Sequence, residues 1–137
     1  MIYSGKDITK AYLLSPLVTL PITVVGTALV SLLQGERLLS MAFSWGLIFS
    51  AVTVPTAYLA TFLFATPFVI SANSAGSPIS AASAHIVGAV ASVAVSIGWA
   101  VALFLRGTPN ATTIPFVLVV GVLSGLATSH LFHRFLE

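Results

Sequence analysis

Residues 15–31 read SPLVTLPITVVGTALVS, and this stretch sets the pattern for the whole chain. It is apolar apart from small hydroxyl side chains, which recur at every fourth position: Ser15, Thr19, Thr23, Thr27 and Ser31. Four residues advance an α-helix by about 400°, so this spacing places the five side chains on one slanted ridge. The stretch therefore predicts an apolar helix with a single hydroxyl-bearing face.

The composition of the chain indicates which environment surrounds this helix. Of 137 residues, 58% are hydrophobic and only 6% are charged, and the mean hydropathy is +1.09. Soluble domains carry about 25% charged residues, and a chain of this size cannot enclose so much apolar surface in one core. The lipid bilayer is therefore the first predicted partner. The net charge of +2 comes from five basic and three acidic residues, so no basic patch predicts a nucleic-acid partner.

Four apolar segments are long enough to cross a bilayer, which takes about 20 residues. They cover residues 11–34, 38–70, 82–105 and 113–132, and short segments rich in small, polar or charged residues separate them. We therefore predict an all-α, polytopic membrane protein. Its single domain, residues 1–137, is expected to be a four-helix transmembrane bundle with short loops.

Two prolines predict irregular helices. One straight helix over residues 38–70 would be about 50 Å long, against a hydrocarbon thickness of about 30 Å. We expect this helix to bend at Pro55 or to place one end in the interface, because proline removes a helical hydrogen bond and clashes with the preceding turn. In the first segment, Pro21 leaves the Leu17 carbonyl without its usual donor, which predicts a bend there.

The basic residues predict the orientation of the chain in the membrane. Four spans put both termini on one face, together with Lys6, Lys10 and Arg134, and put Arg37 and Arg106 on the other face. By the positive-inside rule both termini are cytoplasmic, with a margin of one basic residue and the terminal amine. We expect a multi-pass protein of the plasma membrane or the bacterial inner membrane, and insertion in both orientations stays open.

Small residues form ridges on three of the four predicted helices. Besides the hydroxyl ridge, the third segment carries Gly88, Ser92 and Ser96, and the fourth carries Gly121 and Gly125. Helices in lipid associate by close backbone approach and interhelical hydrogen bonds, so these faces predict helix–helix packing. The glycine pair of the fourth segment fits a neighbouring helix and also a second copy of the chain. We therefore expect a homo-oligomer or another membrane protein as partner.

The hydroxyl ridge has a second interpretation, in which Thr19, Thr23 and Thr27 line a polar path. The carbonyl that Pro21 frees needs a donor, and a neighbouring helix, a water molecule or a bound solute can supply it. Packing and a polar path stay open as alternatives for this face.

The histidines form a candidate pH-sensing or metal-binding site. The predicted topology brings His85, His130 and His133 to one membrane face, close to the carboxylate of Glu137. Histidines beside a carboxylate can bind a divalent metal or act as a pH-sensitive gate. Histidines near a helix C-terminus also stabilise the helix dipole and anchor the helix at the interface. Because the positions supply no complete ligand set, we predict no bound metal and no cofactor.

The distribution of charge excludes several classes of function. The cores of the four segments contain no Asp, Glu, Lys or Arg, which argues against an antiporter built on a buried carboxylate. The chain has no cysteine, and no serine–histidine or acidic pair has the spacing of a catalytic site, so we predict no enzyme.

Two classes of function remain. The sequence favours a small integral membrane protein that acts through helix–helix contacts in a homo-oligomer or membrane complex, as an accessory subunit, an assembly factor or an immunity-type protein. The alternative is an uncoupled channel or small-molecule transporter with a hydroxyl-lined path.

Overall fold

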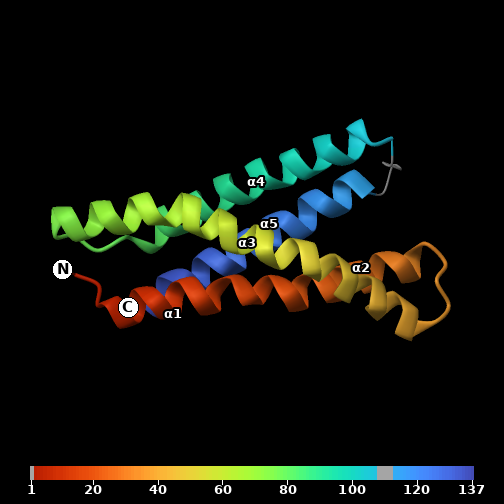
Figure 1. Cartoon of the computed structure of the whole chain (residues 1–137), viewed down its shortest axis with the longest axis horizontal. Helices are drawn as coiled ribbons and strands as arrows, with labels where there is room; N and C mark the ends of the chain where they lie inside the picture. The colour runs from red at the N-terminus through yellow and green to blue at the C-terminus, as the bar shows by residue number, and fades with distance from the viewer. Residues whose placement is uncertain (1, 108–112) are drawn as a thin grey trace.

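The computed structural model describes residues 2–107 and 113–137, and within them it forms long helices and no strand (Figure 1). The elements in chain order are α1 (Gly5–Leu14), the 3-10 turn η1 (Ser15–Val18), α2 (Thr19–Leu33), α3 (Leu39–Ala75), α4 (Ala81–Leu105) and α5 (Thr113–Leu136). The first three elements together form one membrane-spanning unit, and each of the last three is long and apolar enough to span by itself. The predicted all-α fold of a multi-pass, four-helix membrane protein is confirmed.

The helices extend beyond the segments that hydropathy predicts. The first begins at Gly5 instead of residue 11, where the Ser4 side chain accepts a hydrogen bond from the first turn. The helix α3 continues to Ala75 instead of ending at residue 70. It ends at Gly76, whose φ of 67° is a left-handed conformation that glycine adopts without strain. These extensions consist largely of polar and small residues, which form helix here because capping groups satisfy the helix ends.

The irregularity expected near Pro21 lies one turn earlier. Ser15–Val18 form the 3-10 turn η1, with Pro16 in its first turn, and the helix α2 then runs without a break. The Thr19 N–H is directed towards the Pro16 carbonyl, in the i→i−3 pattern of a 3-10 turn.

The helix α3 remains continuous over 37 residues although it contains Pro55 and Pro67. Figure 1 shows its axis changing direction near the middle of the helix, the part in which Pro55 lies. The hydroxyl of Tyr58, in the same part, donates to the Leu13 carbonyl over 2.6 Å. This bond joins the middle of α3 to the first helix just before its 3-10 turn.

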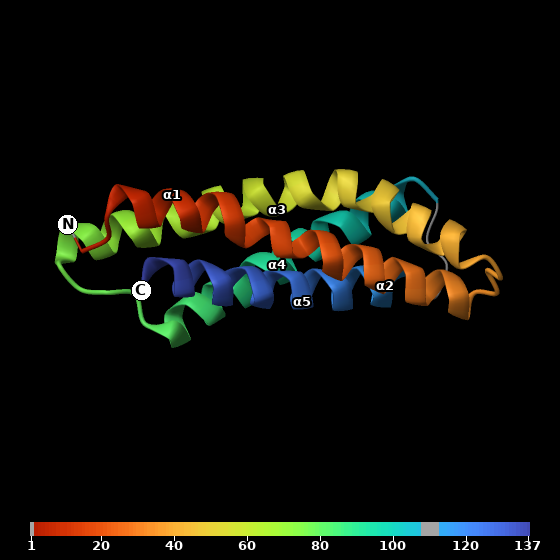
Figure 2. The ribbon, with the colours of Figure 1, turned by 90° about the horizontal axis from the view of Figure 1, so that it is seen from below.

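The helices form two hairpins, α2–α3 and α4–α5, which lie together at one end and diverge at the other (Figure 1). Both termini lie at the closed end, as an even number of spans requires (Figure 2). An apolar cluster joins the hairpins there; it consists of Tyr3, Ala11, Val69, Ala72, Phe132 and Leu136. The Tyr3 hydroxyl also accepts a hydrogen bond from the Ile79 N–H, over 2.6 Å.

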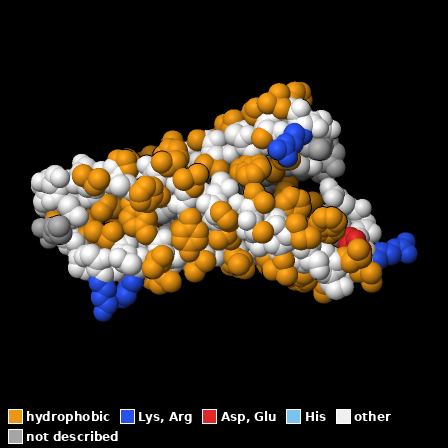
Figure 3. All heavy atoms as spheres, viewed as in Figure 1, with side chains coloured by type: hydrophobic (Ala, Val, Ile, Leu, Met, Phe, Trp, Pro, Cys, Tyr) orange, Lys and Arg blue, Asp and Glu red, His pale blue; other side chains and the backbone are white. Residues whose placement is uncertain are grey.

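The distribution of side chains is that of a membrane protein, with large apolar groups outside and small polar groups inside. Figure 3 shows apolar side chains along the length of one face, with the Lys and Arg side chains at its two ends. Among residues 2–107 and 113–137, the buried polar residues are all Ser or Thr: Ser15, Thr19, Thr23, Thr27, Ser50, Ser92, Ser96, Ser124, Thr128 and Ser129. Hydroxyl groups therefore line the interior between the helices.

Candidate functional site

The small-residue rows of α4 and α5 face each other within the chain. A Cβ atom placed on Gly125 would lie 2.9 Å from the Gly88 carbonyl oxygen and closer still to the Ser92 side chain. In the same way, Gly121 lies against Ser96. Each glycine of one helix thus makes room for a serine or backbone group of the other. The structure places all five residues of the two predicted rows in this contact between neighbours of one chain.

The hydroxyl ridge of the first helix points into the bundle, but its members have different partners. Ser15 donates to the Ala11 carbonyl of its own helix, over 2.6 Å. The Thr23 hydroxyl lies 3.0 Å from the hydroxyl of Thr53 on α3. Ser31, at the end of the ridge, is partly buried. The two remaining members, Thr19 and Thr27, are buried and border a cavity.

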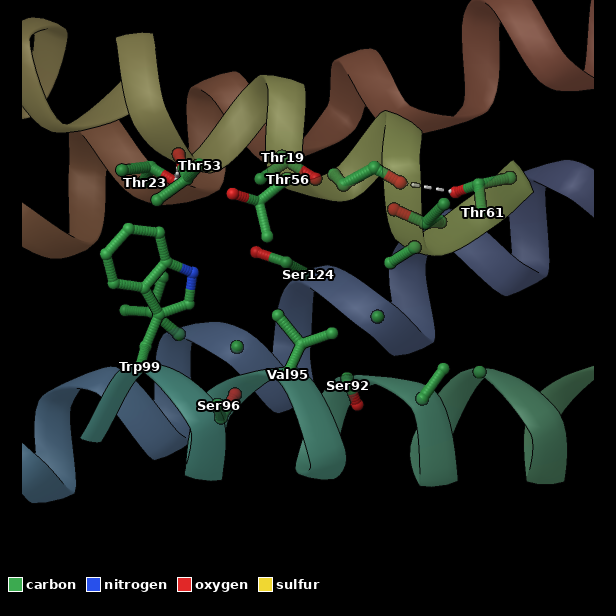
Figure 4. A pocket seen from close by; sticks show the side chains of 18 of the residues that line it. Thr19, Thr23, Thr53, Thr56, Thr61, Ser92, Val95, Ser96, Trp99 and Ser124 are labelled. Atoms are coloured by element: carbon green, nitrogen blue, oxygen red, sulfur yellow. Dashed lines mark hydrogen bonds between the residues drawn. The ribbon is translucent and has the colours of Figure 1, made fainter. Parts of the chain in front are cut away.

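This cavity lies between the two hairpins and has a volume of about 630 Å³ (Figure 4). Residues of α2, α3, α4 and α5 form its wall. Most of the wall is apolar, and its aromatic members are Phe49, Phe64, Phe68, Trp99, Phe116 and Phe132. Small-molecule sites in proteins have volumes of roughly 300 to 1,000 Å³ and a mostly apolar lining. The cavity therefore has the size and the lining of such a site.

Three hydroxyls of the wall are buried and have no hydrogen-bond partner: those of Thr19, Thr27 and Ser124. Thr56 and Thr61, also in the wall, show the usual arrangement, in which each hydroxyl donates to a carbonyl of the preceding turn over 2.8 Å. Leaving a buried hydroxyl unpaired costs about 1 to 3 kcal/mol, and such groups are rare in native proteins. The three residues border the cavity, but their oxygen atoms are themselves buried. A polar group in the cavity can therefore bond them once the side chain turns about its Cα–Cβ bond.

The residues that carry the unpaired hydroxyls border the cavity on two sides. Thr19 and Thr27 lie on one ridge of α2, about 12 Å apart along the helix axis, whereas Ser124 belongs to α5. Figure 4 shows the Ser124 side chain directed from α5 towards α3, and the Trp99 ring extending from α4 into the same space. A molecule between the hairpins would therefore contact polar groups from both of them and an aromatic ring at its side.

Charge is confined to one end of the cavity. Among the described residues that line it, Arg106 is the only one with a charged side chain. Arg106 caps the C-terminus of α4, at the end where the hairpins diverge. The other described residues of the lining offer hydroxyls, the indole N–H of Trp99, backbone and apolar groups. They can bond neutral polar groups but cannot neutralise a charge.

The structure separates the three histidines into a pair and a single residue. The rings of His85 and His130 lie 5.5 Å apart, measured between their centroids. His133 faces elsewhere: its Nε2 lies 3.1 Å from the Ile79 carbonyl oxygen, and its Nδ1 lies 3.6 Å from the Glu137 carboxylate. Within residues 2–107 and 113–137, no three side chains of His, Cys, Asp or Glu come close enough to hold a metal ion. The predicted trio is therefore not one cluster.

Two parts of the cavity were not predicted from the sequence. The first is the α3 side, where Thr53, Thr56 and Thr61 line the wall. The helical spacing of these threonines around Pro55 could have indicated this side from the sequence. The second is Ser124, which lies between Gly121 and Gly125 on α5; the sequence analysis named only the two glycines.

Fold and site together define a class, namely multi-pass helical membrane proteins with a solute-sized cavity between two hairpins. No protein-family model, curated protein or solved structure matches the chain. The function must therefore be inferred from the geometry of the cavity itself.

Proposed function

We propose that the protein is an uncoupled carrier or channel in which a small molecule passes between the two hairpins. The observation that carries this proposal is the cavity of about 630 Å³ with three buried, unpaired hydroxyls in its wall. A concave, mostly apolar site with a few converging polar groups is the usual form of a small-molecule site. Hydroxyls that pack helices together would bond to helix carbonyls, as those of Thr56 and Thr61 do.

The two ends of the cavity differ, which indicates the end at which the proposed path is closed in this conformation. The apolar cluster around Val69 and Phe132 closes the end that carries the termini, and a hydrogen bond of 2.8 Å between Tyr12 and Thr66 adds to the closure. At the other end the surface is hollowed between the diverging hairpins (Figure 3). With both termini cytoplasmic in a plasma or bacterial inner membrane, the open end faces outwards. Passage then requires the hairpins to part at the terminal end.

An uncoupled mechanism agrees with the electrostatics of the lining. Carriers driven by protons or sodium use an ionisable group inside the membrane that binds the coupling ion. The described lining carries its single charge, Arg106, at the open end and hydroxyls elsewhere. Movement of a neutral solute down its own gradient needs no further group.

Action through contacts with a second copy or another membrane protein stays a separate prediction. The rows that suggested it, on α4 and α5, pack against each other. Such a partner would therefore have to bind through the large apolar side chains of the outer surface, among them Leu59, Phe62 and Ile86.

The absence of natural cysteine permits a direct test of the path. Val95 lines the cavity, and Val93 on the same helix lies outside the lining and is 40% exposed on the surface. In lipid vesicles, we expect a hydrophilic thiol reagent to modify Val95→Cys faster than Val93→Cys by on the order of tenfold, because a thiolate forms more readily where water reaches it. A carrier exposes Val95→Cys to both sides of the membrane. Failure of the reagent to modify this variant from either side would contradict the proposal.

A further inference from the structure

We infer that the molecule in this cavity is an uncharged amphiphile, with an apolar body and one or two hydroxyl or carbonyl groups that bond to Thr19, Thr27 and Ser124. The inference rests on the proposed function and names the class of molecule that the path takes. It follows from three features of the wall: the unpaired hydroxyls, the position of the single charge and the apolar lining.

The unpaired hydroxyls favour a polar group on the molecule. A hydroxyl donates one hydrogen bond and accepts up to two, and those of Thr19, Thr27 and Ser124 make none with the protein. A pure hydrocarbon would leave all three unpaired. Water molecules alone fit poorly, because a buried water needs two to four polar partners, and Thr19 and Thr27 lie two helical turns apart on a mostly apolar wall.

The position of the charge requires that the polar group be neutral. A buried ion is stable only when an opposite charge and further hydrogen bonds surround it. Arg106, the single charged side chain of the described lining, lies at the open end and is exposed, whereas Ser124 is 8% exposed in the middle of α5. An anion at Ser124 would therefore have no counter-charge.

The apolar lining requires that most of the molecule be apolar. Phe64, Phe68 and Val95 offer no hydrogen bond, and Trp99 has a single N–H donor on a large ring. A sugar or another polyol would leave several hydroxyls against these surfaces, each with a desolvation cost. An amphiphile matches both parts of the wall.

The two tryptophans of the chain provide a local test. Trp99 lines the cavity, and Trp45 on α3 lies outside its lining. The variant Trp45→Phe leaves Trp99 as the reporter, and bromine quenches tryptophan fluorescence on contact. The probes are ω-bromoundecanol, bromoundecane and ω-bromoundecanoate, added to the protein in lipid vesicles. We expect saturable quenching by the alcohol, with an affinity on the order of tenfold above those of the alkane and the carboxylate. The reverse variant, Trp99→Phe, reports simple partition into lipid through Trp45 and gives no saturation.

Matched variants assign the binding to the three hydroxyls. Combining Thr19→Val, Thr27→Val and Ser124→Ala is expected to weaken binding of the alcohol by about tenfold, the effect of losing one or two hydrogen bonds. Combining Thr9→Val and Ser44→Ala leaves it unchanged, because those hydroxyls bond to carbonyls of their own helices and lie outside the lining. If the triple variant does not fold, Ser124→Ala alone and the comparison of the three probes on the parent protein carry the test.

Three outcomes would overturn the inference. They are equal affinity for the alcohol and the alkane, unchanged binding in the hydroxyl variants, and tightest binding of the carboxylate with its loss in Arg106→Gln. In each of these cases modification of Val95→Cys would still support a path, so the proposed function would stand. Absence of both the saturable quenching and the cysteine modification would overturn the inference and the function together.

Discussion

Gly125→Leu is expected to separate α4 from α5 and to cost the bundle several kcal/mol of unfolding free energy. A Cβ atom at this position would lie 2.9 Å from the carbonyl oxygen of Gly88, a backbone atom that cannot move without moving the helix. Extra methylene groups at a packed position typically cost about 1 to 3 kcal/mol. A leucine adds further carbon atoms beyond Cβ, so its cost should lie towards the top of this range. Thermal or denaturant unfolding in detergent micelles measures the loss.

Gly98→Leu is the matched control for this prediction. Gly98 belongs to α4, and a Cβ atom placed on it meets nothing within 4 Å. Glycine forms helix less readily than alanine by about 1 kcal/mol, so a side chain at Gly98 should leave stability unchanged or raise it. Equal destabilisation by the two variants would show that α4 and α5 do not pack through Gly125.

Ala91→Phe is expected to abolish binding in the cavity while the bundle remains folded. Ala91 is buried on the side of α4 that faces the cavity, so the added ring enters empty space instead of a packed contact. Occupation of the space that the solute needs should lower affinity by tenfold or more, which corresponds to about 1.4 kcal/mol. Quenching of Trp99 by the bromoalcohol measures this loss.

Ala94→Phe controls for the added ring itself. Ala94 lies on α4 but is exposed on the outer surface and absent from the lining. A ring there contacts lipid, so binding should be retained. A loss of binding in Ala94→Phe equal to that in Ala91→Phe would place the quenching site outside the cavity.

The sequence predicts the fold well because the bilayer imposes a simple constraint. An apolar helix must be long enough to cross it, and each expected span coincides with a helix. The exact ends were harder to predict, because Gly5 and Ala75 lie in polar segments whose helical structure depends on caps. The 3-10 turn at Ser15–Val18 depends on how the first helix packs, which periodicity does not report.

The site was only partly predictable, and the hydroxyl ridge shows why. Ser15, Thr23 and Thr27 occupy equivalent positions of one four-residue repeat. Ser15 bonds to its own helix, Thr23 bonds to α3, and Thr27 has no partner. Spacing identifies the face of a helix, but what lies opposite that face depends on the tertiary structure. The same pattern is compatible with packing, which the sequence favoured, and with a polar path.

The histidines also show that the tertiary structure decides which side chains meet. The topology correctly predicted that they share one end of the bundle, but the rotation of α5 decides which neighbours they meet. His130 turns towards His85, whereas His133 turns towards Ile79 and Glu137. A shared membrane face is thus a much weaker condition than a shared site.

The proposed function requires that a small molecule lies between the two hairpins. Native mass spectrometry of the untagged protein, released from its own membrane under mild conditions, tests it most directly. We predict copies of this chain that carry an adduct on the order of a few hundred daltons, the size that a cavity of this volume accommodates, and we predict that Ala91→Phe removes the adduct. Recovery of the chain without an adduct, in stoichiometric complex with a different membrane protein, would contradict the claim and favour a function through helix contacts.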